Sequence, residues 1–165
     1  MPISIPRKLS RWAVHTAVSG AVASTLSSVA VALCSARETG RPSAGVNAAS
    51  QWIWGRRAKR HVRASWRYTA VGYAIHHVSS MLWAGVYEYW CTRSPTRGTA
   101  GKLGKAAAVA ALACTIDYTV TPRRFRPGFE RHIGRPSIAL VYATFAAGLL
   151  AAHACRARGK RLTRY

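Results

Sequence analysis

Four long apolar runs separated by polar segments divide the sequence. They cover about residues 12–36, 68–91, 103–121 and 136–155. As helices rising about 1.5 Å per residue, runs of about 20 residues can cross a hydrocarbon core about 30 Å thick. None of them carries the charged face that a surface helix of a soluble bundle needs. The pattern therefore predicts an all-α fold, an integral membrane bundle of about four transmembrane helices with basic loops, in a single domain over residues 1–165.

The four runs differ in strength. The second has aromatic residues at both ends, as interfacial anchors do, and the fourth begins at Pro136, a residue favoured in the first turn of a helix. The third is the weakest, because it is short, rich in Ala and contains Asp117. The first has a basic start, and its Cys34-Ser35-Ala36 end resembles a signal cleavage site. It is long for a signal, so we favour a retained span. Removal of residues 1–36, or a total of three spans, is the alternative.

Small residues recur at every fourth position in the first and last runs. They are Thr16, Gly20, Ser24 and Ser28, and then Thr144, Gly148 and Ala152. Residues four apart lie on one face of a helix, and small side chains let helix backbones approach closely in lipid. The two stripes predict contacts between helices.

The charge of the chain is strongly positive, with 25 Lys and Arg against four acids and a formal net charge of +21. Such a charge favours an anionic partner. All the bases lie outside the apolar runs except Lys105, at the start of the third run, whereas a nucleic-acid-binding domain would place them along a helix face. We therefore expect a phospholipid bilayer with anionic headgroups as the partner, and no nucleic acid. A second copy of the chain and other membrane proteins are further candidates. The bases divide almost evenly between the two sides, so the positive-inside rule gives no orientation.

The longest polar connection, residues 37–67, is predicted to lie in the membrane interface. Trp prefers the headgroup zone, and each clustered base gains about 1 kcal/mol near an anionic leaflet. The predicted headgroup contacts are Trp52, Trp54, Arg56, Arg57, Lys59, Arg60 and Arg63. A solvated basic loop is the alternative interpretation.

Ionisable residues inside the apolar runs are the candidate functional residues, because an acid at the bilayer centre costs about 2.5–3.5 kcal/mol. The candidates are His15, His76, His77, Glu88, Asp117 and His153. Antiparallel packing would bring His15, Glu88 and His153 to one end of the bundle and the other three toward the opposite end. Helical spacing also predicts one shared face on the second run. Its residues are Tyr73, His77, Met81, Ala84 and Glu88.

Three roles compete for these polar residues. The favoured role is structural, with hydrogen bonds between helices that fix their packing. A proton or ion path would use His77, Glu88 and Asp117. A haem-binding bundle would take its axial ligands from His15, His76, His77 and His153, and it is the least favoured.

No catalytic or metal-binding motif occurs in the sequence: it lacks GxSxG, HExxH, a P-loop and zinc-type Cys spacing. We therefore expect no enzyme, no metal and no cofactor. The predicted function is that of a structural or accessory membrane protein. A small transporter or proton-coupled channel is the alternative.

Three stretches resemble a group of small bacterial inner-membrane proteins without an established activity. They are Asn47-Ala-Ala-Ser-Gln-Trp-Ile-Trp-Gly55, residues 76–88, and residues 117–124 running into 127–130. In that group a His often follows the Ser of the first stretch, where this chain has Gln51, which argues against a metal role for the loop. The resemblance implies a multi-pass protein of the bacterial inner (cytoplasmic) membrane and no particular activity.

Overall fold

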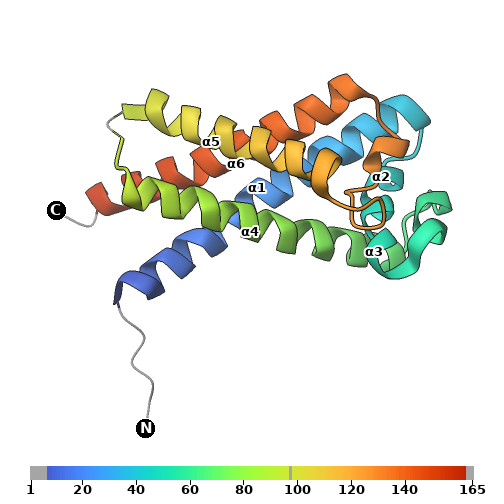
Figure 1. Ribbon diagram of the computed structural model, residues 1–165, viewed down its shortest axis with the longest axis horizontal. Helices are drawn as coiled ribbons and strands as arrows, with labels where there is room; N and C mark the ends of the chain where they lie inside the picture. The colour runs from blue at the N-terminus through green and yellow to red at the C-terminus, as the bar shows by residue number, and fades with distance from the viewer. Residues whose placement is uncertain (1–6, 97, 163–165) are drawn as a thin grey trace, which may run out of the picture.

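Four long helices form an antiparallel bundle in the computed structural model, which describes residues 7–96 and 98–162 (Figure 1). They are α1 (Arg7–Thr39), α4 (Val71–Arg93), α5 (Gly98–Thr115) and α6 (Arg135–Leu162). Helix α1 packs against α4 and α6, and α5 packs against the same two helices. The core between them consists mostly of small residues around Tyr87, Val109, Phe145 and Leu149. Arg97 and Arg164, two of the predicted loop and tail bases, lie outside the described residues.

The two long connections fold together over one end of the bundle, and we call them the cap (residues 40–65 and 121–134). The cap holds the shorter elements α2 (Ser43–Ala49), α3 (Gln51–Trp54), the 3₁₀ turn η1 (Gly55–Arg60) and the 3₁₀ turn η4 (Phe129–Arg131). Two π turns, η2 (Trp66–Ala70) and η3 (Ile116–Val120), join the cap to α4 and α5. Helix α2 contacts η4 from the other connection and also packs on α1 and α4. The cap is therefore fixed to the bundle.

Three of the predicted spans match helices that are long and apolar enough to cross a membrane. These are Leu9–Thr39, Gly98–Val120 and Arg135–Cys155. The third run, predicted to be the weakest, is among them because α5 begins at Gly98 and continues through η3 without a break. The second run is not, although α4 is 23 residues long, which corresponds to about 35 Å. Its hydropathy is lowered by polar residues, and three of these, His76, His77 and Glu88, contact serines of α1.

Both predicted small-residue stripes lie at helix contacts. Gly20 packs against Met81 of α4 so closely that a Cβ there would overlap the sulfur. A Cβ at Gly148 would lie 2.5 Å from the Cα of Ala23 in α1. Close backbone approach of this kind stabilises helix association in lipid, where burial of apolar surface contributes little driving force.

The predicted interfacial loop, residues 37–67, is more compact than the sequence indicated. Asn47, Ser50 and Gln51 are buried in it, together with several alanines. Gln51 donates a hydrogen bond to the carbonyl of Arg126 at 2.6 Å, and Gly128 approaches Ala48 with a positive φ of 90°. A side chain at Gly128 would be strained and would meet the Ala48 carbonyl, so glycine allows the two connections to pack as one cap.

Candidate functional site

The predicted polar face of α4 is turned toward α1, and serine hydroxyls of α1 meet it. Ser24 is hydrogen-bonded to Nδ1 of His77 at 2.7 Å, and Ser27 to Nε2 of His76 at 2.8 Å. Toward the cap, Tyr73 contacts the hydroxyl of Thr25 at 3.3 Å. We call this contact the α1–α4 seam. The shared face on α4 is confirmed. The consecutive residues His76 and His77 both reach serines of α1.

Glu88 lies near the other end of the seam and is only 3% exposed. It accepts a hydrogen bond from the hydroxyl of Ser19, and Nδ1 of His15 lies 3.9 Å from its second oxygen. His15 and Glu88 are therefore neighbours, as antiparallel packing predicted. Arg93, the last residue of α4, donates to the hydroxyl of Tyr89 at 3.1 Å. His153 is on α6, which runs parallel to α4, toward this same end (Figure 1).

Apolar contacts separate the two polar groups of the seam. Glu88 and His77 are 11 residues apart on α4, about 16 Å along the axis. Gly20 and Met81 pack tightly between them. The hydrogen bonds of Ser24 with His77 and of Ser19 with Glu88 link α1 to α4 on either side of this contact, as polar contacts between packed helices do.

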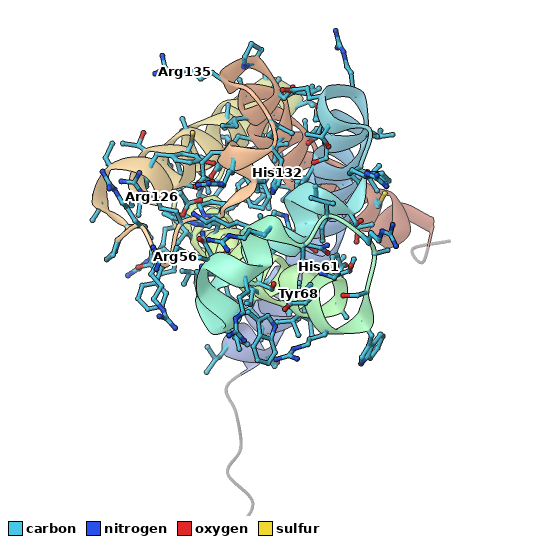
Figure 2. The ribbon with its side chains drawn as sticks, turned by 90° about the vertical axis from the view of Figure 1, so that its right-hand side faces the viewer. Arg56, His61, Tyr68, Arg126, His132 and Arg135 are labelled. Atoms are coloured by element: carbon cyan, nitrogen blue, oxygen red, sulfur yellow. The ribbon has the colours of Figure 1, made fainter. Side chains whose placement is uncertain are left out.

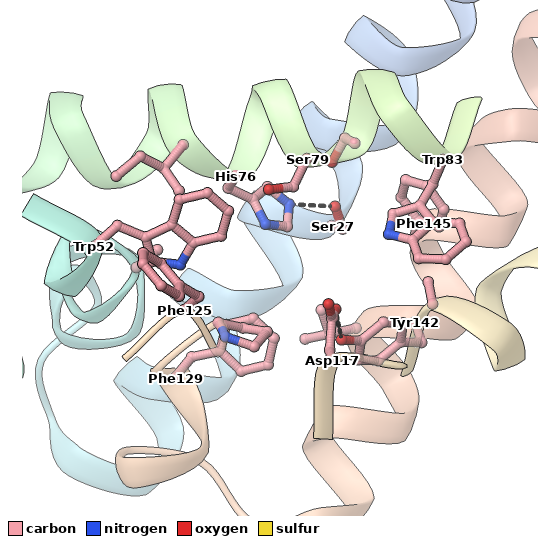
Figure 3. A pocket seen from close by; sticks show the side chains of 16 residues that line it. Ser27, Trp52, His76, Ser79, Trp83, Asp117, Phe125, Phe129, Tyr142 and Phe145 are labelled. Atoms are coloured by element: carbon pink, nitrogen blue, oxygen red, sulfur yellow. Dashed lines mark hydrogen bonds between the residues drawn. The ribbon is translucent and has the colours of Figure 1, made fainter. Parts of the chain in front are cut away.

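A cavity lined by residues of both the cap and the bundle lies where the two meet. Its volume is about 60 Å³. Trp52, Phe125 and Phe129 of the cap line one part, and Trp83, Tyr142 and Phe145 of the bundle line another (Figure 3). We call this cavity the aromatic pocket.

Two of the predicted polar residues line the aromatic pocket from opposite sides, Asp117 from η3 and His76 from α4 (Figure 3). Asp117 accepts a hydrogen bond of 2.6 Å from the hydroxyl of Tyr142 in α6. His76 is held by Ser27 of α1. The pocket thus joins all four long segments of the bundle, and its only acid is Asp117. His77, Glu88 and His15 do not line it.

The predicted headgroup contacts lie on the cap, but the two tryptophans already have protein neighbours. Trp52 packs edge to face on Phe125, with ring centroids 5.6 Å apart. The guanidinium of Arg67 lies 4.2 Å from the ring centre of Trp54. Arg56, Arg57, Arg60 and Arg63 are exposed, whereas Lys59 is half-buried. Figure 2, seen from the cap end, shows basic side chains from both connections, including Arg56 and Arg126.

The cap bases are not neutralised by the chain itself. Among the described residues, no Lys or Arg of the cap is in an ion pair with an acid. His132 adds no charge near neutral pH, because burial lowers its pKa below the usual value while its ring contacts the carbonyl of Lys59 at 3.1 Å. The cap therefore carries an uncompensated positive charge.

Trp66, one of the aromatic residues predicted to anchor the start of the second run, is 89% exposed beside the cap. Sequence reasoning missed other residues of these sites. Lys105, counted as a loop base, is buried and donates to the carbonyls of Trp90 and Ser94 at the end of α4. Phe125 and Phe129 were not predicted, because they lie in a connection whose sequence indicated only a basic turn. Their signal was present, since aromatic residues beside helix ends often line a cavity.

Within residues 7–96 and 98–162, no three His, Cys, Asp or Glu side chains lie close enough to hold a metal ion. Comparison with protein-family models, with curated proteins and with solved structures finds no match to this chain. The geometry of the bundle, the cap and the aromatic pocket must therefore carry the functional argument.

Proposed function

We propose that the chain is a multi-pass membrane protein in which all four long helices cross the bilayer and the cap contacts anionic headgroups. In this proposal its role is structural or accessory, and the resemblance noted in the sequence favours a bacterial inner membrane. The single observation that carries the proposal is the reversed polarity of the bundle. Polar side chains such as Ser19, Ser27 and Glu88 are buried, while large apolar side chains are exposed on the helices between the basic ends.

Helix α4 shows this reversed polarity most clearly. Its outer face carries Val78, Leu82 and Val86, which are 66%, 67% and 39% exposed. Its histidines and Glu88 point inward to partners on α1. In lipid, polar groups are tolerated when they face the bundle interior and are hydrogen-bonded there. The polar side chains that lower the average hydropathy of α4 are therefore shielded from lipid. This supports a fourth span.

The exposed surface of the other helices agrees with a lipid environment. Leu26 and Leu33 of α1, Leu112 of α5 and Leu140 of α6 are between 43% and 66% exposed. Soluble monomers seldom expose a contiguous apolar surface of this kind. At the cap end, Trp66 and the unpaired bases provide the aromatic and cationic groups that prefer a headgroup layer.

The lipid contact predicts that an anionic lipid stabilises the protein in detergent. Phosphatidylglycerol should raise the unfolding temperature of the wild type more than phosphatidylcholine does, because ligand binding to the folded state raises stability. Changing Arg56, Arg57 and Arg60 to Gln should remove most of the difference. Each base is worth about 1 kcal/mol near the surface, and 1 kcal/mol corresponds to about 2–4 °C for a chain of this size. Circular dichroism during heating measures the shift.

The matched control changes the same three arginines to Lys, which keeps the charge. This triple variant should retain the response to phosphatidylglycerol. If the Gln variant responds as strongly as the wild type, the cap does not bind headgroups through these bases.

A further inference from the structure

The aromatic pocket has a chemical character opposite to that of the rest of the molecule. The chain carries a formal charge of +21, yet no Lys or Arg lines the pocket. Its charged group is the carboxylate of Asp117, one of only four acids in the chain. Around it stand aromatic rings from both the cap and the bundle (Figure 3). An acid placed in an aromatic pocket of a basic protein needs a chemical explanation.

We propose that the aromatic pocket binds a small organic cation with apolar substituents, such as a substituted ammonium ion. The faces of Trp, Tyr and Phe attract cations through the ring quadrupole, and quaternary ammonium groups are commonly held in this way. The carboxylate of Asp117 supplies the opposite charge. This inference goes beyond lipid contact at the cap and does not depend on it.

The geometry of Asp117 leaves the carboxylate available to a ligand. The hydroxyl of Tyr142 donates a single hydrogen bond to it, at 2.6 Å to Oδ2. This bond orients the carboxylate but does not neutralise it. Among the described residues, no Lys or Arg is in an ion pair with it. Asp117 is half-buried. A carboxylate partly withdrawn from water is stabilised by an opposite charge nearby, so a bound cation would supply what the chain does not.

Other ligand classes fit the pocket less well. An anion would meet the carboxylate and the negative faces of the rings, with no base in the wall to offset them. A bare metal ion would need several polar ligands, and no group of three His, Cys, Asp or Glu forms within the described residues. A neutral apolar molecule or a lipid chain could fill the space, but it would leave the charge of the Asp117 carboxylate without an opposite charge.

The pocket is reached near the level of the cap. Trp52 and Phe125, whose rings are in contact, are 37% and 44% exposed and form the outer part of its wall. A cation with apolar groups concentrates at a membrane–water interface, because its charge prefers the headgroups and its apolar part the lipid. The proposed ligand therefore gathers at the depth where the pocket opens.

The test uses three probes of similar shape and different charge: phenyltrimethylammonium, neutral tert-butylbenzene and anionic benzenesulfonate. Binding to the purified full chain in detergent is measured by isothermal titration calorimetry. We expect the wild type to bind the cation at least tenfold more tightly than the neutral probe and not to bind the anion. Asp117→Asn should weaken cation binding at least tenfold and leave the neutral probe unchanged. Glu88→Gln removes a buried acid outside the pocket, and it should change neither the affinity for the cation nor the affinity for the neutral probe.

A substitution at the pocket wall provides an independent check if Asp117→Asn does not fold. Phe125→Leu keeps an apolar side chain but removes one ring. It should weaken binding of the cation several-fold more than binding of the neutral probe. Equal affinities of the wild type for cation and neutral probe would show an apolar cavity and overturn the proposal. Absence of cation binding, or equal binding by Asp117→Asn, would overturn it too, without affecting the response of the cap to phosphatidylglycerol.

Discussion

Replacing Gly148 with alanine will lower the unfolding temperature of the bundle, whereas the same substitution at Gly104 will not. Gly148 lies in α6 against α1, and an added Cβ would be 2.5 Å from the Cα of Ala23 and 3.0 Å from its nitrogen. These neighbours are backbone atoms, so the overlap can be relieved only if the two helices separate. Overpacking of this kind costs about 1–3 kcal/mol, and separation also weakens contacts along the rest of the α1–α6 interface.

Gly104 in α5 is the matched control, because a Cβ there meets nothing within 4 Å. Alanine favours a helix over glycine by about 1 kcal/mol, so Gly104→Ala should leave stability unchanged or raise it slightly. Thermal unfolding in one detergent compares both variants with the wild type, and Gly148→Leu should be worse than Gly148→Ala. Equal unfolding temperatures for Gly148→Ala and Gly104→Ala would show that α1 and α6 do not pack this closely.

The second large effect is expected at Asn47, which is fully buried in the cap. Its Nδ2 donates to the carbonyls of His61 and Arg63, both at 2.8 Å, and its Oδ1 accepts from the hydroxyl of Thr69 at 2.7 Å. One side chain thus ties α2 to residues 61–63 of the cap and to η2, which leads into α4. Each buried polar group left without a partner costs about 1–3 kcal/mol. Asn47→Ala should therefore lower the stability of the cap by about 3 kcal/mol or more.

Two further variants separate the hydrogen bonds from the loss of volume. Asn47→Asp keeps the size of the side chain but places a carboxylate oxygen opposite the two carbonyls, so it should be at least as harmful as alanine. Thr69→Val removes one of the three bonds and should have the smallest effect. Thermal unfolding and the rate of proteolysis within residues 40–65 measure the series. A change of less than 1 kcal/mol in Asn47→Ala would contradict the bonding described for the cap.

The helical elements were largely predictable, because apolar runs bounded by bases determine where helices lie. The small residues at Gly20 and Gly148 also indicated contacts, since spacing alone places them on one face of a helix. The face of α4 that carries His77 and Glu88 followed from the same periodicity, and its partners on α1 are serines of the predicted stripe or residues beside it.

The cap and the aromatic pocket were not predictable, because they depend on contacts between distant segments. Gln51 bonds to Arg126, which is 75 residues away, and the local sequence around either gives no sign of the other. Asp117 and Tyr142 meet for the same reason, through packing of η3 on α6. The average hydropathy of α4 was similarly ambiguous, since it does not record which side chains face inward.

The central claim is that α4 crosses the bilayer with the other three helices. It is tested by determining on which side of the membrane each loop lies. In a chain freed of its native cysteines, Arg57→Cys and Arg124→Cys report on the two cap connections, and Ser94→Cys reports on the turn after α4. Each is labelled with a membrane-impermeant maleimide in sealed vesicles of known orientation. Four spans predict that positions 57 and 124 are labelled from one side and position 94 from the other. Labelling of 57 and 94 from the same side, with 124 opposite, would show that α4 does not cross the membrane.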